Sequence, residues 1–311
     1  MRTVLGTMTF GGQVDEAGSS TLIEQFRARG HRELDTAYVY NDGATETLLG
    51  SLRAQGRLDG LPIAGKANPW VSDGLTAASV TRQLETSLER LGASSLDIFY
   101  LHAPDLDTAI EETLASVAEH HSAGRFGRFG LSNYAAWQVA EIVGLCERHG
   151  WPRPEVYQGM YNALTRDVER ELLPCLARFG MAFYAYNPLA GGLLSGKYRS
   201  VDDLPDDGRF AANESYRARY WKREYFEVVA RFAAVSREHD IEPAAAALRW
   251  LCHHSAIAAG EHAIILGATS DAHLAANLDA CEQGRLPDDL VAALDAGWET
   301  VRPACIKYFR P

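Results

Sequence analysis

Two patterns of apolar residues alternate along this chain. Short apolar runs rich in β-branched and aromatic residues are typical of buried strands, and longer segments with an apolar residue every three or four positions are typical of helices. Residues 77–91 show the helical pattern, with Val80, Leu84 and Leu88 on one face. Gly92 follows at once, and glycine is the usual residue just beyond a helix because it accepts the left-handed conformation there.

The alternation amounts to eight strand–helix units. Strands are predicted at residues 4–7, 33–36, 62–66, 96–102, 127–132, 156–160, 182–186 and 263–267. Helices are predicted at residues 21–29, 46–53, 77–91, 108–123, 137–148, 168–179, 225–239, 243–253, 272–281 and 289–300. The stretch from 186 to about 223 is predicted to be irregular, with a mobile acidic loop at 202–208.

The number of units and the length together predict the fold. Eight strand–helix units in 311 residues favour a closed α/β structure, the (β/α)8 TIM barrel, over an open sheet. The last predicted helix and the residues after it would form an extra C-terminal helix and tail. We therefore expect residues 1–311 to form a single barrel domain.

Composition permits a large core and narrows the classes of partner. Hydrophobic residues make up 47% of the chain, which is enough for a barrel of this size. The formal net charge of −11 argues against general binding of nucleic acid, which requires basic surface to displace counterions. No apolar run approaches the roughly 20 residues that a membrane-spanning helix needs, so we expect no membrane partner.

Cysteine usage predicts a reducing compartment. The five cysteines are scattered and form no C-x-x-C pair: Cys146, Cys175, Cys252, Cys281 and Cys305. We interpret them as reduced thiols of a cytoplasmic protein. His253 and His254 follow one of them, but this spacing fits no common zinc site, so we expect no metal. Because Met1 leads almost directly into a predicted strand, we expect no signal peptide.

Four polar residues lie at the ends of three successive predicted strands. Asp35 and Tyr40 follow the strand that begins at residue 33, Lys66 ends the next strand, and His102 ends the one after it. The strand ends of a parallel barrel converge on one face, so these side chains could share a site. A phenol normally holds its proton to about pH 10, and a nearby ammonium is expected to lower the pKa of Tyr40. Asp35 would keep Lys66 charged, and the His102 imidazole would donate a hydrogen bond to a carbonyl oxygen.

Each signal also has a plainer explanation. A single polar residue at a strand end is more often structural than catalytic, and only the four together favour a catalytic site. Residues 191–197 come close to a P-loop, but Tyr198 stands where that loop needs serine or threonine, so we interpret them as a glycine-rich flap that contacts phosphate. No two glycines are separated by one residue, which argues against the Rossmann fingerprint and the dehydrogenases that carry it.

Over essentially its whole length the chain resembles the aldo-keto reductases, in particular the branch of aflatoxin-aldehyde and succinic-semialdehyde reductases. The resemblance is carried by residues 34–40, 65–70, 97–104, 130–134, 156–162, 184–198 and 308–310. The first of these segments reads Leu-Asp-Thr-Ala-x-x-Tyr, and the family's Asp-Tyr-Lys-His tetrad is complete. The resemblance implies NADPH-dependent reduction of aldehydes, and some ketones, to alcohols. Tyr40 would be the general acid, Lys66 and Asp35 would tune it, and His102 would orient the carbonyl.

The resemblance also implies where the cofactor, NADPH or NADP+, would bind. Ser132, Asn133 and Gln158 match positions that bind the nicotinamide carboxamide, and Tyr186 lies where a ring can stack on the nicotinamide. The segment that covers the pyrophosphate contains Asn187, Pro188, Leu189, Gly191, Gly192, Leu193, Ser195, Gly196 and Lys197. The segment that holds the adenosine 2′-phosphate contains Gly267, Ser270, His273 and Asn277.

One departure from the family's pattern bears on the preference for the cofactor, and the implied substrate residues bear on the choice of substrate. His273 stands where many relatives carry arginine or glutamine, so a bidentate guanidinium grip on the 2′-phosphate is missing, and Arg209 is expected to supply part of that charge. The implied substrate residues are His102, Tyr216, Arg219 and Arg310. Arginines in such a pocket suit a substrate that bears a carboxylate.

The resemblance leaves alternatives open. Potassium-channel β subunits resemble the same family, so the chain could instead be a regulatory subunit that binds NADPH with little turnover. The chemistry is reversible, so oxidation of an alcohol is a third reading. The implied partner is a small-molecule aldehyde or dicarbonyl, such as succinic semialdehyde, methylglyoxal or 2-carboxybenzaldehyde, and this branch of the family also suggests a homodimer.

Overall fold

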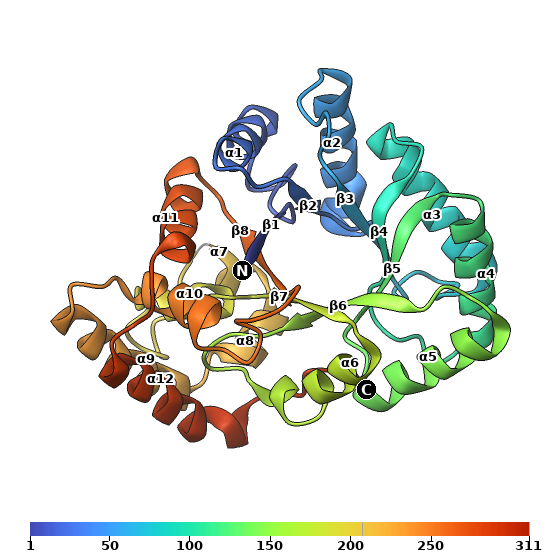
Figure 1. Cartoon of the computed structure of the whole chain (residues 1–311). Coiled ribbons are helices and arrows are strands. Elements are labelled where there is room, and N and C mark those ends of the chain that lie inside the picture. The colour runs from blue at the N-terminus through green and yellow to red at the C-terminus, as the bar shows by residue number, and fades with distance from the viewer. Residues whose placement is uncertain (207, 311) are drawn as a thin grey trace.

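The computed structural model describes residues 1–206 and 208–310, and in this part of the chain eight parallel strands close into a barrel (Figure 1). Each strand is hydrogen-bonded to the next in chain order, and β8 pairs with β1. The strands are β1 Arg2–Gly6, β2 Glu33–Asp35, β3 Ile63–Ala67, β4 Leu96–Leu101, β5 Phe126–Ser132, β6 Pro154–Met160, β7 Ala182–Tyr186 and β8 Ala263–Gly267. The predicted (β/α)8 barrel is confirmed, and the carboxyl ends of its strands open on one face.

Helices surround the strands on the outside (Figure 1). They are α1 Glu16–Ala28, α2 Ala44–Ala54, α3 Ala77–Leu91, α4 Ile110–Ser122, α5 Ala136–His149, α6 Leu172–Phe179, α7 Gly208–Ala212, α8 Glu214–Tyr220, α9 Arg223–Glu238, α10 Pro243–His253, α11 Asp271–Glu282 and α12 Asp288–Val301. The extra C-terminal helix α12 runs beside α9. The tail beyond it returns to the barrel, where the backbone N–H of Arg310 donates to the Asn133 carbonyl at 2.9 Å.

Local sequence signals explain α3, which like α10 was predicted with the correct bounds. Thr76 caps the start of α3, where its hydroxyl accepts a hydrogen bond from the Ser79 N–H at 3.3 Å. Gly92 ends the helix with a φ of 58°, a left-handed conformation that costs glycine little.

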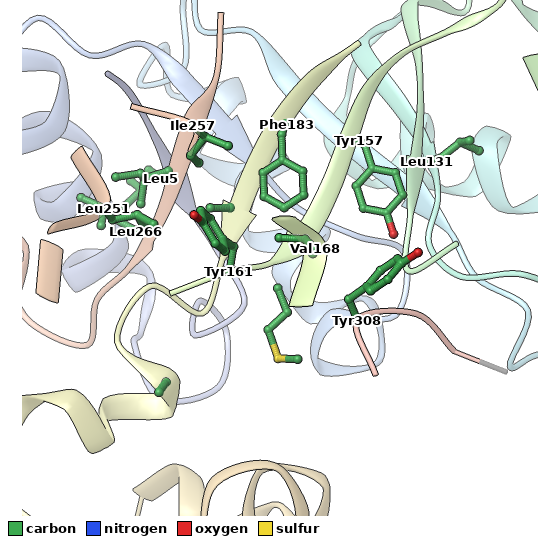
Figure 2. Packing of buried hydrophobic residues seen from close by; sticks show 14 of the residues in the cluster. Leu5, Leu131, Tyr157, Tyr161, Val168, Phe183, Leu251, Ile257, Leu266 and Tyr308 are labelled. Carbon is green, nitrogen blue, oxygen red and sulfur yellow. The ribbon is translucent and has the colours of Figure 1, made fainter. Parts of the chain in front are cut away.

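The core has two layers. Inside the barrel lie small and medium side chains with two tyrosines: Val4, Ala64, Ile98, Tyr100, Val156, Tyr184, Ala263 and Ile265. Between the strands and the helices lies a larger apolar layer, part of which is shown in Figure 2. There the rings of Tyr157 and Phe183, on neighbouring strands, stack at 5.9 Å, and Tyr308 of the tail lies beside Tyr157. The tail is therefore packed into the core next to the strands that end at the site.

Three of the predicted segments were wrong in part. The helix predicted at 21–29 is α1, which begins earlier, at Glu16. The helix predicted at 168–179 is split into a 3-10 turn, Asp167–Glu169, and α6. Pro174 explains the late start of α6, because proline has no N–H and is tolerated only in the first turn of a helix. The stretch predicted to be irregular holds a 3-10 helix, Ala190–Ser195, and both α7 and α8. The loop predicted at 202–208 includes residue 207, which lies outside the described residues, so its mobility stays a prediction.

Candidate active site

The four strand-end residues come together at the carboxyl face of the barrel. Asp35 is the last residue of β2, Lys66 lies in β3, and His102 directly follows β4. Tyr40 begins the 3-10 turn Tyr40–Gly43 between β2 and α2. The sequence prediction that these side chains converge follows from the closure of the barrel, which puts neighbouring strand ends side by side.

A buried ion pair forms the base of the site. The Lys66 ammonium donates to the Asp35 carboxylate at 2.5 Å and to the Thr36 carbonyl at 2.6 Å, and its third close neighbour is the Tyr40 hydroxyl at 3.4 Å. The other Asp35 oxygen accepts from the Gln158 amide at 2.8 Å. Both side chains of the pair are almost fully buried, so neither charge is stable there without the other.

The pKa of Tyr40 departs from the sequence prediction. The Lys66 ammonium was expected to lower it, but burial and the negative charge of Asp35 raise the pKa of Tyr40 well above its ordinary value. Burial also acts on Lys66, where it favours the uncharged amine and so lowers the pKa. The charges of Asp35 and then Glu46 oppose this effect. The sequence reasoning counted the charges but not the loss of solvent around the phenol. Tyr40 thus holds its proton at neutral pH, as a proton donor must.

His102 lies between two aromatic rings at the mouth of the barrel. Its imidazole meets the Tyr40 ring edge-on at 6.0 Å and the Trp70 ring at 5.0 Å. Within the described residues its Nδ1 has no hydrogen-bond partner. Burial, then the charges of Lys66 and Arg310, lower the pKa of His102 well below 6.5. The neutral ring can therefore donate one hydrogen bond into the site.

The depressed pKa of His102 predicts how stability varies with pH. Below about pH 6.5 the unfolded chain protonates this imidazole while the folded protein does not, so the free energy of unfolding rises with pH up to that point and then levels off. A difference of one bound proton changes the free energy of unfolding by about 1.4 kcal/mol per pH unit. We expect His102→Gln to weaken this dependence in urea unfolding at about pH 5 and about pH 7. His149→Gln, at an exposed position, is the control, and equal slopes in wild type and His102→Gln would contradict the assignment.

Asn133 links the ends of several strands. It follows β5 with a φ of 64°, and its amide donates to the His102 carbonyl at 2.8 Å and to the Ser132 hydroxyl at 3.0 Å. The Tyr186 hydroxyl, at the end of β7, donates to the Asn133 side-chain oxygen at 2.8 Å. Gln158 lies one strand away on β6. The predicted carboxamide residues and the predicted stacking ring thus form one polar group beside His102.

The predicted pyrophosphate segment is a glycine-rich turn after β7. Positive φ values occur at Asn187, Ala190, Gly191 and Gly192. Leu189 directly precedes the 3-10 helix, which begins at Ala190. The Tyr216 hydroxyl donates to the Asn187 side chain at 2.9 Å. The remaining members take varied places: Pro188 and Leu193 are buried, Ser195 and Gly196 are half-buried, and Lys197 is exposed.

Two features of this turn suit a phosphate group. In the described part of the chain the buried Asn187 amide nitrogen has no partner, so one donor is unused. A Cβ at Gly192 would meet nothing within 4 Å, so open space adjoins the backbone there. Backbone amides and small residues of this kind accommodate anions without a steric barrier.

The predicted adenosine segment lies at the start of α11. Gly267 ends β8, and the Ser270 hydroxyl caps the helix by accepting from the His273 N–H at 3.2 Å. The His273 ring contacts the Thr269 hydroxyl at 3.1 Å, and Asn277 lies one turn further along, half-buried. The positive end of a helix and its free N–H groups attract phosphate, which fits the predicted role.

Three of the predicted substrate residues, Tyr216, Arg219 and Arg310, take part in contacts between arginine side chains and aromatic rings. Tyr216 is buried, and the guanidinium groups of both Arg209 and Arg219 lie over its ring, at 5.0 and 5.1 Å. The Arg310 guanidinium lies over the Trp70 ring at 4.6 Å. Arg209 therefore lies beside Tyr216, and its charge opposes, as a minor effect, the rise in the pKa of Tyr40 that burial and Asp35 cause. Its predicted role at the 2′-phosphate stays a prediction.

Trp70 is the residue at the mouth that the sequence reasoning missed as a site residue. Its side chain is 48% exposed, yet it contacts both His102 and Arg310. The signal was available, because a large aromatic follows Lys66 by four residues in a loop at a strand end.

The described residues also bear on two other kinds of site. They contain no group of three or more histidine, cysteine, aspartate or glutamate side chains arranged to hold a metal ion. Nor does any of their helices have the length and apolarity to cross a membrane.

Comparison with known proteins extends over nearly the whole chain. Residues 2–299 match the profile of the Aldo/keto reductase family. The chain is 48% identical to "Aflatoxin B1 aldehyde reductase member 2" of Mus musculus, over 99% of this chain and 87% of that protein. It is 47% identical to "Aldo-keto reductase family 7 member A3" of Homo sapiens, over 99% of this chain and 97% of that protein. It is 35% identical to "Aldo-keto reductase pigE" of Monascus ruber, over 93% of this chain and 89% of that protein.

Proposed function

The chain belongs to the aldo/keto reductase family, and on this premise we propose that it reduces aldehydes, and some ketones, to alcohols with NADPH. An oxidoreductase activity follows from the family, whereas the cofactor, the proton donor and the substrate are our proposal. Three further predictions belong to the same proposal: a cytoplasmic location, inferred from the scattered cysteines, a single domain over residues 1–311, inferred from the eight strand–helix units, and a homodimer, implied by the resemblance.

The observation that carries the proposal is the chain of contacts from Asp35 through Lys66 to Tyr40. The Lys66 ammonium pairs with the Asp35 carboxylate at 2.5 Å. It also lies 3.4 Å from the Tyr40 hydroxyl. When a carbonyl oxygen gains negative charge in the transition state, Tyr40 can pass it a proton while the adjacent ammonium stabilises the phenolate that remains. Neutral His102 can donate a hydrogen bond to the same oxygen and fix its position.

The residues around this centre fit a nicotinamide cofactor. A bound nicotinamide supplies hydride from its C4. Asn133, Ser132 and Gln158 offer amide and hydroxyl groups for its carboxamide, and the Tyr186 ring borders them. The glycine-rich turn with its unused Asn187 donor would hold the pyrophosphate, and the start of α11 the adenosine phosphate.

The direct test is to follow NADPH oxidation by absorbance with succinic semialdehyde and with an uncharged aldehyde of similar size. NADH is run in parallel, because the histidine at position 273 leaves the grip on a 2′-phosphate without a guanidinium. Rapid NADPH-dependent loss of the aldehyde is the expected result. Tight NADPH binding without turnover on either aldehyde would instead favour a regulatory, cofactor-binding protein.

The two arginines at the mouth predict a preference for acidic aldehydes. Burial and then the charge of Arg219 lower the pKa of Arg310, so these two like charges lie within electrostatic reach of each other. A substrate carboxylate would relieve that repulsion through charge-assisted hydrogen bonds. We expect Arg219→Met to raise KM for succinic semialdehyde by about 10- to 100-fold and to leave KM for the uncharged aldehyde within about twofold. Arg223→Met removes an exposed arginine just beyond α8 and is the control; a similar rise for both aldehydes would contradict a carboxylate contact.

A further inference from the structure

The backbone directly after Tyr40 adopts a conformation that few residues tolerate. Asn41, Asp42 and Gly43 have φ values of 49°, 53° and 89°, so three successive residues are left-handed. Only the third is a glycine; asparagine and aspartate enter the left-handed region more readily than other side chains, but as single residues and at a higher cost than glycine. Such a turn persists only where neighbouring groups fix it, and strain of this kind is typical of functional sites.

One side of the turn is fixed by its own first residue. The Asn41 side-chain amide donates to the Met8 carbonyl at 3.0 Å and to the Phe10 carbonyl at 2.9 Å, both in the segment after β1. It also contacts the Thr45 hydroxyl at 3.1 Å in the first turn of α2. These bonds tie the turn to the neighbouring strand end.

The other side is fixed by Arg90, which reaches over from the last turn of α3. Its guanidinium donates to the Tyr38 carbonyl at 3.2 Å and to the Glu46 carboxylate at 3.1 Å, and it lies over the Tyr38 ring at 4.7 Å. A Cβ on Gly43 would overlap the same guanidinium, so Arg90 also covers the end of the turn. One side chain therefore contacts the chain before Tyr40, after it, and at the start of α2.

The packing of two helices places Arg90 there. Gly50 of α2 lies against the Arg90 carbonyl so closely that a Cβ would overlap it. This close approach brings the end of α3 within reach of the turn. Glu46 is fully buried, whereas Arg90 is 25% exposed, so the guanidinium is the only one of the two that water can reach.

We propose that Arg90 is a positioning residue, which holds the Tyr40 hydroxyl in line with Lys66 by clamping the left-handed turn. This inference rests on the proposed function, in which Tyr40 donates the proton. Arg90 contacts neither Lys66 nor His102 in any hydrogen bond of the described chain, so it acts through the backbone. Loss of the clamp should therefore lower kcat and leave the binding steps alone.

The first test removes the Arg90 guanidinium without leaving the buried Glu46 carboxylate unpaired. The double variant Glu46→Gln/Arg90→Met removes both members of the pair, and Arg90→Met alone is compared with it. We expect kcat to fall by about 10²-fold in both, with KM and the Kd for NADPH within about twofold, because displacement of a reacting group by about 1 Å has effects of this size. Arg153→Met, which breaks an exposed ion pair with Glu147 and has no hydrogen bond to the turn in the described chain, should keep the wild-type kcat.

A second variant displaces the Arg90 guanidinium by a change in the turn itself. Gly43→Ala must push the Arg90 guanidinium aside, and we expect the same fall in kcat. Gly60→Ala is a matched control, since Gly60 also has a positive φ, 70°, but a Cβ there meets nothing within 4 Å. The control carries the same backbone strain without the displacement, so it should keep kcat.

A measurement independent of turnover separates this inference from the proposed function. Amide hydrogen exchange over residues 38–46 should become faster in Gly43→Ala and in the double variant, and stay unchanged in both controls. Wild-type kcat in the clamp variants would overturn the inference and leave the proposed function standing. An inactive wild type would overturn the proposed function, and unchanged exchange would then overturn the clamp itself.

Discussion

Tyr40→Phe is expected to lower turnover with aldehydes by about 10²- to 10⁴-fold, the usual effect of removing a general acid. The phenylalanine ring fills the same space, so the buried pair of Lys66 and Asp35 keeps its contacts and the protein should fold normally. The Kd for NADPH should stay within about twofold, because the hydroxyl is assigned to the proton and not to cofactor binding. Stopped-flow turnover and NADPH fluorescence titration measure the two quantities separately.

Tyr100→Phe is the matched control for this loss. Tyr100 is also a buried tyrosine whose ring lies near the Lys66 ammonium, at 5.9 Å, but it belongs to the interior of the barrel. Its hydroxyl has no hydrogen-bond partner in the described part of the chain, so removing it breaks no bond. Turnover should therefore stay near the wild-type value. Equal activity of Tyr40→Phe and wild type would show that another group supplies the proton.

The spacing of strand ends made the centre of the site predictable. Asp35, Lys66 and His102 each follow an apolar run on three successive strands, and barrel closure alone brings such positions together. The helix pattern with its terminal glycine gave the bounds of α3 directly. These features depend on local sequence and on one global rule, which is why they can be inferred without coordinates.

Other features depend on contacts between distant segments and left no local signal. The pKa of Tyr40 is raised because the folded chain excludes water around it, which no count of neighbouring charges reveals. Arg90 looks like an ordinary charged residue at a helix end, and its approach to the turn at Gly43 depends on how α2 and α3 pack. The hydrogen bond from the Tyr216 hydroxyl to Asn187 in the glycine-rich turn also had no local signal, and the substrate role of Tyr216 stays a prediction.

Lys66→Met is expected to abolish most turnover and also to destabilise the fold. The substitution leaves the Asp35 carboxylate, 4% exposed, as an unpaired buried charge, which typically costs about 3–5 kcal/mol in the free energy of unfolding. The Gln158 amide at 2.8 Å offsets only part of this, because it carries no charge. Turnover should fall by at least as much as in Tyr40→Phe, since the phenolate would lose its neighbouring cation. Urea unfolding and steady-state kinetics measure the two losses.

The double variant Asp35→Asn/Lys66→Met separates the structural part of this effect from the chemical part. Removing both charges of a buried pair is often neutral for stability, so the free energy of unfolding should return to within about 1–2 kcal/mol of wild type. Turnover should stay low, because no ammonium remains beside Tyr40 at the distance of 3.4 Å that Lys66 holds. Arg82→Met breaks a pair whose members are 47% and 36% exposed, and it should leave the free energy of unfolding close to that of wild type. Recovery of turnover together with stability would mean that Lys66 serves the fold and not the proton transfer, and the chain of contacts from Asp35 to Tyr40 would lose its proposed chemical role.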